Sequence, residues 1–205
     1  TGGVVERLTR GLAGLAKRRK VRVVRGDGRF TSPNELRVET PDGTETIGFE
    51  SAIIAAGSEP ARIPGLPDDP RVMDSIGALA LEDVPERLLV IGGGIIGLEM
   101  ATVYDALGSR ITVVEMLDQL LPGCDADLVM PLRKRIAGRY EAIHLGTRVA
   151  GVEATDEGLV VSFDGDEAPD PATVDRILVA VGRRANGGRV GAHAAGVEVD
   201  ERGGI

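Results

Sequence analysis

A glycine-rich loop is the first feature of the sequence that could bind a ligand. Residues 92–97 match the pattern G-x-G-x-x-G, directly after the apolar run Leu88–Ile91 and before helix-like sequence, which is the context of a dinucleotide-binding loop. Gly92 would allow a tight turn, Gly94 would let the backbone approach a pyrophosphate, and Gly97 would let the helix pack on the strand. Amides at the helix start would then face the phosphates.

An acidic residue stands where such a loop needs a partner. Glu115 ends the next strand-like run, Ile111–Val114, about 20 residues after the loop, where a carboxylate accepts hydrogen bonds from the adenosine ribose and repels a 2′-phosphate. Residues 116–123 contain Asp118 but no Arg or Lys. The pattern therefore predicts NAD in preference to NADP. The alternative is an ordinary glycine-rich turn followed by a surface glutamate.

Other reactive side chains are few. Cys124 is the single cysteine, so the chain has no intrachain disulfide and no cysteine-based zinc site. We expect this thiol to be a small semi-buried filler at a helix start. His144 and His193 lack the carboxylate spacing of an acid–base dyad and are interpreted as strand-end or surface residues. No metal site is predicted.

The composition of the 205 residues is that of a globular protein, with 42% hydrophobic and 27% charged residues. A net charge of −8 and few aromatic residues exclude the basic field and stacking platforms that nucleic acids need. The basic run Lys17–Lys20 ends an amphipathic stretch and fits the C-terminal dipole of a helix. The longest charge-free apolar stretch, Leu88–Leu98, is too short for a membrane span, and no secretory signal is visible. We therefore expect a cytoplasmic protein with no nucleic-acid or membrane partner.

The first third of the chain predicts a helix and an antiparallel meander. Apolar residues at helical spacing cover Val4–Arg19. Strand-like runs follow at Val21–Val24, Glu35–Glu39 and Thr46–Ala55, with a turn at Pro41-Asp42-Gly43 between the last two. Four prolines then indicate a linker or domain boundary: Pro60, Pro64, Pro67 and Pro70.

From Leu88 the pattern alternates between strand and helix. The predicted elements are strand Leu88–Ile91, helix Ile95–Leu107 stopped by Gly108, strand Ile111–Val114 and helix Asp125–Ala137. A second meander is predicted from Val149–Glu153, Leu159–Phe163 and Arg176–Val181. Strand–helix alternation implies a parallel sheet with right-handed crossovers. The expected fold is α/β, a Rossmann-like parallel sheet with an inserted antiparallel β-meander.

Several runs of the sequence resemble one enzyme family. They are Leu89–Met100, Val114–Asp118 and Ala180–Arg183, with Gly26–Phe30 and Ile54–Ser58 upstream. In order and over essentially the whole chain, they resemble the dihydrolipoamide dehydrogenases of the pyridine nucleotide–disulfide oxidoreductase family. The resemblance implies a homodimeric flavoprotein that oxidises dihydrolipoamide on the lipoyl domain of a 2-oxo acid dehydrogenase complex. Electrons would pass through a disulfide and FAD to NAD+.

The resemblance also implies which residues meet the cofactors. The NAD site would be lined by Gly92, Gly93, Gly94, Ile95, Ile96, Gly97, Glu115, Val149, Ala180, Val181, Gly182 and Arg183. Ile95 would lie over the flavin ring near the nicotinamide. Gly28, Ala56 and Gly57 would lie near FAD. Glu99 matches a family glutamate that pairs with a lysine beside the flavin, a lysine that this chain lacks; alternatively, Glu99 is an acid favoured by the dipole at a helix start.

The sequence departs from the family pattern in what it lacks. It has no Cys-x-x-x-x-Cys pair, no amino-terminal FAD-binding glycine motif and no His–Glu dyad, so no catalytic residue is assigned. We therefore expect an interior segment of a longer enzyme, inactive alone and without stoichiometric FAD. Residues 1–67 would be part of an FAD domain, residues 68–190 an NAD domain, and residues 191–205 a return to the FAD domain.

Two alternatives stay open at the level of sequence. One is a stand-alone NAD-binding module without chemistry of its own. The other is a different member of the same family, such as an NADH oxidase or a mercuric reductase.

Overall fold

The computed structural model describes residues 2–205 and divides them into two compact units. One contains the described residues up to Gly57 together with Ala185–Ile205, and the other is Ser58–Arg184. The divisions after Gly57 and Arg184 fall ten and six residues before the domain boundaries expected from sequence, which lie after residues 67 and 190. Thr1, assigned by sequence to the partial FAD domain, lies outside the described residues. Which cofactor belongs to each unit stays a prediction.

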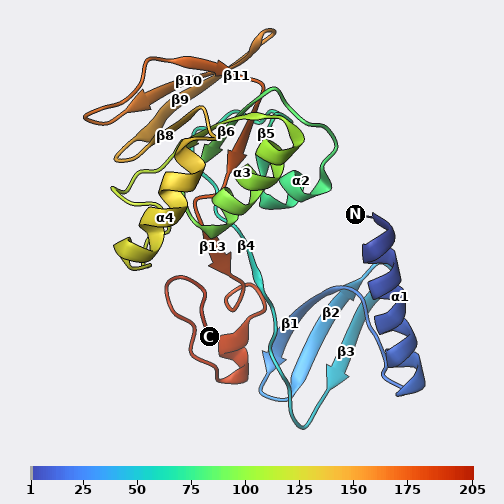
Figure 1. The fold of residues 1–205 in the computed structure, drawn as a ribbon. Helices are drawn as coiled ribbons and strands as arrows, with labels where there is room; N and C mark the ends of the chain where they lie inside the picture. The colour runs from blue at the N-terminus through green and yellow to red at the C-terminus, as the bar shows by residue number, and fades with distance from the viewer. Residues whose placement is uncertain (1) are drawn as a thin grey trace. The chain divides into compact units, whose positions relative to one another are not determined.

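The first unit is built on a small antiparallel sheet. Its elements are α1 (Gly2–Arg18), β1 (Asp27–Ser32), β2 (Glu35–Thr40), β3 (Gly43–Gly48) and the 3-10 helix η1 (Ala192–Ala195), and the sheet order is β1-β2-β3 (Figure 1). Thr40 pairs with Gly43, so the predicted turn is confirmed. The carbonyl of Val190 accepts a 2.9 Å hydrogen bond from the Phe30 amide, which ties the carboxyl-terminal segment to β1.

Two strand predictions in this unit are wrong. Val21–Val24 is not a strand, because Lys20 turns the chain with a φ of 56° and the Val21 amide bonds back to Ala16 at the end of α1. The third strand ends at Gly48, and the chain to Gly57 has no regular structure, so the predicted strand Thr46–Ala55 is mostly loop. The outer strand beside β2 is instead β1, whose polar sequence carries no strong strand signal.

The second unit contains a five-stranded parallel sheet. Its strands, in spatial order, are β5 (Val72–Asp74), β12 (Arg176–Val179), β6 (Arg87–Ile91), β7 (Arg110–Val114) and β8 (Ala142–His144). The helices are α2 (Ser75–Ala80), α3 (Ile95–Leu107) and α4 (Ala126–Ala137). Two short strands, β4 (Ser58–Pro60) and β13 (Arg183–Ala185), pair with each other in a separate two-stranded sheet. The predicted α/β class, with an inserted antiparallel meander, is confirmed.

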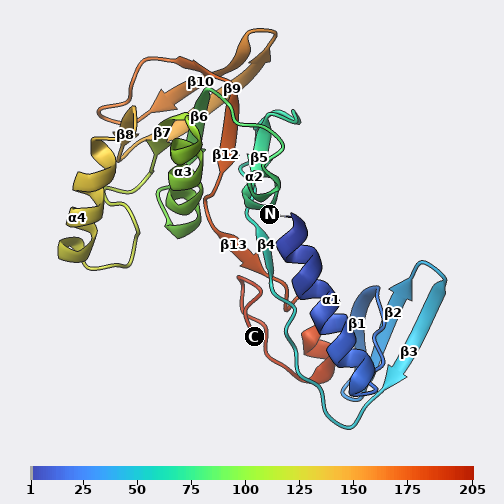
Figure 2. The same cartoon turned by 45° about the vertical axis from the view of Figure 1, so that its right-hand side comes forward.

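Each face of the parallel sheet has its own core. Along β6, Leu88 and Val90 pack with the helices, whereas Leu89 and Ile91 pack with the antiparallel strands on the other face. Those strands are β9 (Arg148–Thr155), β10 (Gly158–Asp164) and β11 (Ala172–Val174), which lie apart from α2, α3 and α4 (Figure 2). Because side chains alternate along a strand, the single apolar run of β6 contributes side chains to both cores. The strand can therefore lie at the centre of the unit.

The third strand of the second meander is a further wrong prediction. The residues that pair with β10 are Ala172–Val174, and Arg176–Val179 joins the parallel sheet between β5 and β6. Asp175 separates the two strands, and its carboxylate binds the Arg87 amide at the start of β6. The short elements β4, β5, α2, β8 and β13 are absent from the sequence-based prediction, whereas α3 has the predicted bounds and ends at Gly108.

Candidate functional site

The turn after β6 depends on glycine at two positions. Gly92 has a φ of 109°, and a Cβ there would lie 2.4 Å from the Ala180 carbonyl oxygen. At Gly97, in the first turn of α3, a Cβ would lie 2.1 Å from the Gly92 oxygen and 3.2 Å from Val90 Cγ1. These contacts confirm the turn predicted at Gly92 and the close helix–strand packing predicted at Gly97.

Gly94 differs from these two glycines. It is the N-cap of α3 with a φ of −76°, no side chain caps the helix there, and its own Cβ position has no atom within 4 Å. The backbone thus offers open space beside a helix start, where the first amides have no partner within the helix. Such a place suits an anionic group.

Glu115 lies directly under the glycine loop. The residue is 8% exposed; Oε2 accepts a 2.7 Å hydrogen bond from the Gly93 amide, and Oε1 accepts one of 2.9 Å from the Leu117 amide. The sequence placed this acid correctly at the end of β7 but gave no sign of its bond to the loop, because that contact depends on the three-dimensional turn. The alternative of a surface glutamate is wrong.

The end of β12 forms the third part of the same edge. The Ala180 amide donates to the Ile91 carbonyl at 2.8 Å, Val181 is exposed, and Gly182 has a φ of 123°. The Gly182 carbonyl accepts from the Ala61 amide at 3.0 Å. The carboxyl ends of β6, β7 and β12 therefore meet in one place, which is where ligands bind in open parallel sheets.

The Arg183 guanidinium bonds to the protein itself. Nε donates to Ser58 Oγ at 2.7 Å, one terminal nitrogen donates to the Ser58 carbonyl, and the other lies 3.4 Å from Ser75 Oγ. The arginine thus connects the strand after Gly182 to β4 and to the start of α2. Arg183 would therefore influence a nucleotide site by positioning the backbone to which it is bonded.

The other residues named from sequence have different settings. Ile95 is 64% exposed and Ile96 is half-buried at the start of α3, while Val149 on β9 packs against the core that contains Ile91 and Val114. Gly28, Ala56 and Gly57 belong to the other compact unit.

In that unit, the side-chain and backbone nitrogens of Asn186 donate to the carbonyls of Ala56 and Gly57, each at 3.1 Å. Gly28 lies on β1 against the Leu36 side chain.

Three side chains with possible chemistry lie away from these contacts. Glu99 is exposed on α3, and Cys124 is exposed, so the semi-buried filler predicted at Cys124 is wrong. His144 ends β8, and its carbonyl accepts from the Glu115 amide at 2.9 Å. Among the described residues, no group of three or more His, Cys, Asp or Glu side chains could hold a metal ion, and no helix is long and apolar enough to cross a membrane.

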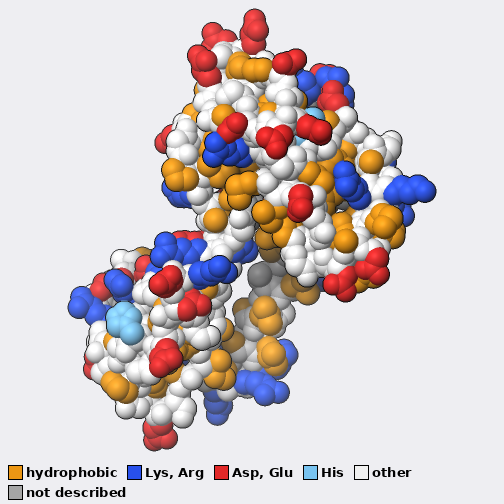
Figure 3. Space-filling view, turned by 90° about the vertical axis from the view of Figure 1, so that its left-hand side faces the viewer, with side chains coloured by type: hydrophobic (Ala, Val, Ile, Leu, Met, Phe, Trp, Pro, Cys, Tyr) orange, Lys and Arg blue, Asp and Glu red, His pale blue; other side chains and the backbone are white. Residues whose placement is uncertain are grey.

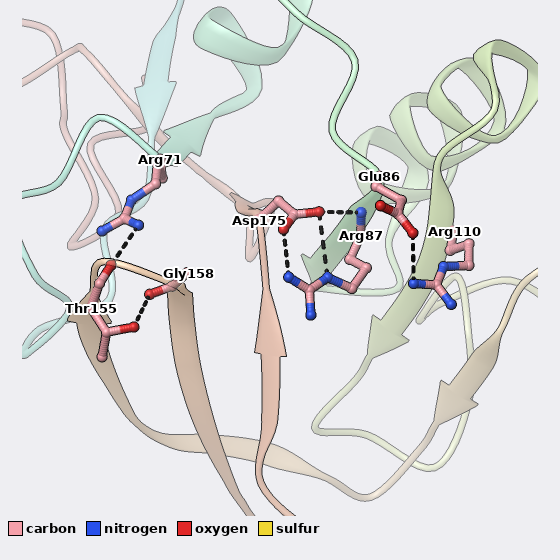
Figure 4. Close-up of polar contacts among 7 residues, drawn as sticks. All are labelled: Arg71, Glu86, Arg87, Arg110, Thr155, Gly158 and Asp175. Atoms are coloured by element: carbon pink, nitrogen blue, oxygen red, sulfur yellow. Dashed lines mark hydrogen bonds and ion pairs between the residues drawn. The ribbon is translucent and has the colours of Figure 1, made fainter.

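The opposite edge of the sheet is lined by ion pairs. An arginine stands at or just before the start of four strands, and the pairs are Arg71–Asp69, Arg176–Asp83, Arg87–Asp175 and Arg110–Glu86, at 2.6–3.0 Å. Figure 4 shows Arg87 and Asp175 facing each other beside Glu86 and Arg110. Hydrogen bonds from Arg71 hold the pKa of Asp69 at about 2, and bonding to Arg87 lowers the pKa of Asp175.

On the face seen in Figure 3, acidic and basic side chains are interspersed. This mixed pattern fits the net charge of −8, and the visible surface has no continuous basic field.

The fold and the carboxyl edge of the parallel sheet define a Rossmann-like α/β protein with a glycine loop between its central strand and the next helix. Residues 3–205 match the family described as pyridine nucleotide-disulphide oxidoreductase. The chain belongs to that family.

Individual relatives agree with this assignment. The chain is 52% identical over 202 residues to a dihydrolipoyl dehydrogenase of Vibrio cholerae, covering 98% of this chain and 42% of the relative. A dihydrolipoyl dehydrogenase of Thermus scotoductus is 43% identical, and the match covers 98% of this chain and 43% of that relative. The chain therefore spans less than half the length of these curated relatives.

Among solved structures, a mutant of the flavoprotein disulfide reductase RclA from Escherichia coli superimposes with a TM-score of 0.88. It is 29% identical, with 98% of this chain and 46% of that chain covered.

Proposed function

We propose that the unit Ser58–Arg184 binds NAD at the carboxyl edge of its parallel sheet, as the NAD-binding part of a dihydrolipoyl dehydrogenase. The whole protein would oxidise dihydrolipoamide through a disulfide and FAD, and bound NAD+ would accept the hydride. The names of the relatives with 52% and 43% identity support this activity. The cytoplasm, a homodimer and a lipoyl domain as substrate carrier are parts of the same proposal.

The observation that carries the proposal is the space beside Gly94. In a loop where added Cβ atoms at Gly92 and Gly97 would strike backbone at 2.4 and 2.1 Å, a Cβ at Gly94 would meet nothing within 4 Å. Glycine at position 94 is therefore explained by no contact within the protein. An anionic group bound against the backbone at the start of α3 would explain it, since a pyrophosphate needs that close approach.

The acidic surroundings of Glu115 support NAD rather than NADP. Each oxygen of Glu115 accepts one amide hydrogen bond, and a carboxylate oxygen has room for a second, so ribose hydroxyls could still donate to it. Asp118, Asp166 and Glu167 line a shallow groove together with Leu145 and Gly146. A 2′-phosphate near these carboxylates would be repelled.

The remaining NAD-site residues extend this arrangement. We assign the phosphates to the amides of Gly94–Gly97, with Ile95 and Ile96 at the start of α3 and with Gly93 holding the loop, and the rest of the nucleotide to the segment Ala180–Arg183 and to Val149. FAD would belong to the other unit, near Gly28, Ala56 and Gly57. For the 205 residues alone we expect no lipoamide reductase activity, since Cys124 is the single cysteine and the route through a disulfide needs two.

The test is calorimetric titration of the chain with NADH and NADPH. We expect NADH to bind more tightly, and Gly94→Ala to weaken NADH about tenfold or more without changing the thermal midpoint, because the new methyl occupies only the space meant for the ligand. Gly138→Ala is the matched control, since its Cβ also meets nothing within 4 Å but lies at the end of α4. Equal affinity for both nucleotides would refute the role of Glu115, and unchanged NADH affinity in Gly94→Ala would refute the phosphate site.

A further inference from the structure

We propose that Glu115 is a positioning residue as well as a ribose acceptor. With Leu120 and Leu121, it fixes the conformation of the glycine loop through Gly93, so the segments that contact phosphate and ribose form one rigid unit. This inference rests on the proposed NAD site and concerns how that site is held in shape. It assigns a function to Gly93, which the G-x-G-x-x-G pattern leaves as an unspecified position.

Gly93 is held by both of its backbone polar groups. Its amide donates to Glu115 Oε2 at 2.7 Å in a buried contact, and its carbonyl accepts from the Leu121 amide at 2.9 Å. Both partners belong to the segment that follows β7. The two groups belong to the peptide units before and after Gly93, and neither unit can rotate without breaking its hydrogen bond to that segment.

The third side of Gly93 is closed by a side chain. A Cβ at this position would lie 2.5 Å from Leu120 Cδ2 and 3.2 Å from Glu115 Cβ. Leu120 has no exposed surface and belongs to the core on the helix side of the sheet. A side chain at position 93 would therefore have to displace Leu120 within the core.

Glu115 is itself anchored at every polar group. Its amide donates to the His144 carbonyl at 2.9 Å and its carbonyl accepts from the Thr147 amide at 3.0 Å. The second carboxylate oxygen is bonded to the Leu117 amide. A buried carboxylate is stable only when such donors surround it, so its geometry is defined before any nucleotide binds.

Two roles for the same carboxylate predict different results with two ligands. ADP and 2′,3′-dideoxy-ADP carry the same adenine and phosphates, but only ADP has the ribose hydroxyls. A residue that recognises only ribose affects the binding of ADP alone. A residue that positions the loop affects the binding of both.

The experiment is an NMR titration of the isotope-labelled chain with each ligand, in the wild type and in Glu115→Gln. A glutamine presents one acceptor oxygen and an NH₂ group, so one of the two amide bonds is lost while the side chain keeps its size. We expect Glu115→Gln to weaken dideoxy-ADP about tenfold or more, the scale of a hydrogen bond to a charged group. An unchanged affinity for dideoxy-ADP, with weaker ADP binding, would overturn the proposal.

A second measurement needs no nucleotide and separates this inference from the proposed function. Hydrogen exchange of the Gly93 amide should be slow in the wild type and at least tenfold faster in Glu115→Ala, which removes both acceptor oxygens, with exchange in the centre of β6 unchanged. If neither ligand binds the wild type, the proposed NAD site fails, yet the exchange result still tests whether Glu115 fixes the position of Gly93. Equal exchange rates at Gly93 in both proteins would overturn it.

A pair of substitutions tests the contribution of Leu120. Gly93→Ala should lower the thermal midpoint in the wild-type background and lower it much less in a Leu120→Ala background, where the space at Cδ2 is free. The same cost in both backgrounds would show that Leu120 does not define the position of Gly93.

Discussion

The two edges of the parallel sheet differ in the residues that form them. At the carboxyl edge, the strands end in glycines, free helix amides and one buried carboxylate, Glu115. At the amino edge, four strands have an arginine at or just before their start, each paired to aspartate or glutamate. The amino edge has its charges satisfied within the protein, whereas the carboxyl edge has backbone donors left for a ligand.

The difference separates the side chains that stabilise the unit from those that could bind. The Asp175 carboxylate accepts from the Arg87 amide and from its guanidinium, so it joins β12 to β6 at their starts. The Glu115 carboxylate joins β7 to the loop after β6 at their ends. Both acids connect neighbouring strands, but only the second lies beside open backbone, because Gly94 has no neighbour at its Cβ position.

The largest expected effect is at Gly97. We expect Gly97→Ala to lower the free energy of unfolding by about 3 kcal/mol, because the new Cβ would lie 2.1 Å from the Gly92 oxygen and rigid backbone would have to move. Urea denaturation measures this value. Gly94→Ala, in the same loop but in open space, should change stability by less than about 0.5 kcal/mol. Similar losses in the two variants would contradict the division between structural and ligand-facing glycines.

The sequence predicts the central elements of this unit well, and for a local reason. Leu88–Ile91 is a continuous apolar run and Ile111–Val114 is interrupted only by Thr112, as is typical of parallel strands covered on both faces, and helix α3 begins and ends at glycines. The sequence does not predict the place of Arg176–Val179, because its partners, β5 and β6, are distant in the chain. A short apolar strand after a meander carries no local sign of which sheet it joins.

The site itself was predictable only in part. The glycine loop and Glu115 follow from spacing, since strand ends in a parallel sheet meet at one edge. The bond from Gly93 to Glu115 and the space taken by Leu120 depend on how two loops fold over each other. No pattern of residue types encodes that contact, so Gly93 was indistinguishable in the sequence from the glycines beside it.

A smaller effect is expected at the amino edge. Asp175→Ala removes the acceptor of the Arg87 amide and guanidinium, and we expect it to lower the free energy of unfolding by about 1 kcal/mol, because both side chains are partly exposed. NADH affinity should not change. Asp164→Ala, which breaks the more exposed pair with Arg148, is the control and should cost less. Weaker NADH binding in Asp175→Ala would show that the two edges are not independent.

The smallest effect is the pH dependence contributed by Asp69. Hydrogen bonds from the Arg71 side chain and amide lower the pKa of this carboxyl to about 2 from its usual 3.8. Because the folded-state pKa is the lower one, the stabilisation is fully present above pH 3.8 and is lost as the pH falls towards 2. The difference in unfolding free energy between the wild type and Asp69→Asn should therefore shrink over that range, as measured by urea denaturation at several pH values.

Arg71 also donates to the Thr155 carbonyl at 2.9 Å (Figure 4), so the pair links the amino edge to the hairpin β9–β10. Protonation of Asp69 weakens the hold on that arginine. The acid-dependent loss should therefore appear as faster exchange of the Thr155–Gly158 turn, with the Gly93 amide unaffected. A parallel change at Gly93 would mean that the two edges of the sheet respond to acid as one unit, which their separate sets of partners argue against.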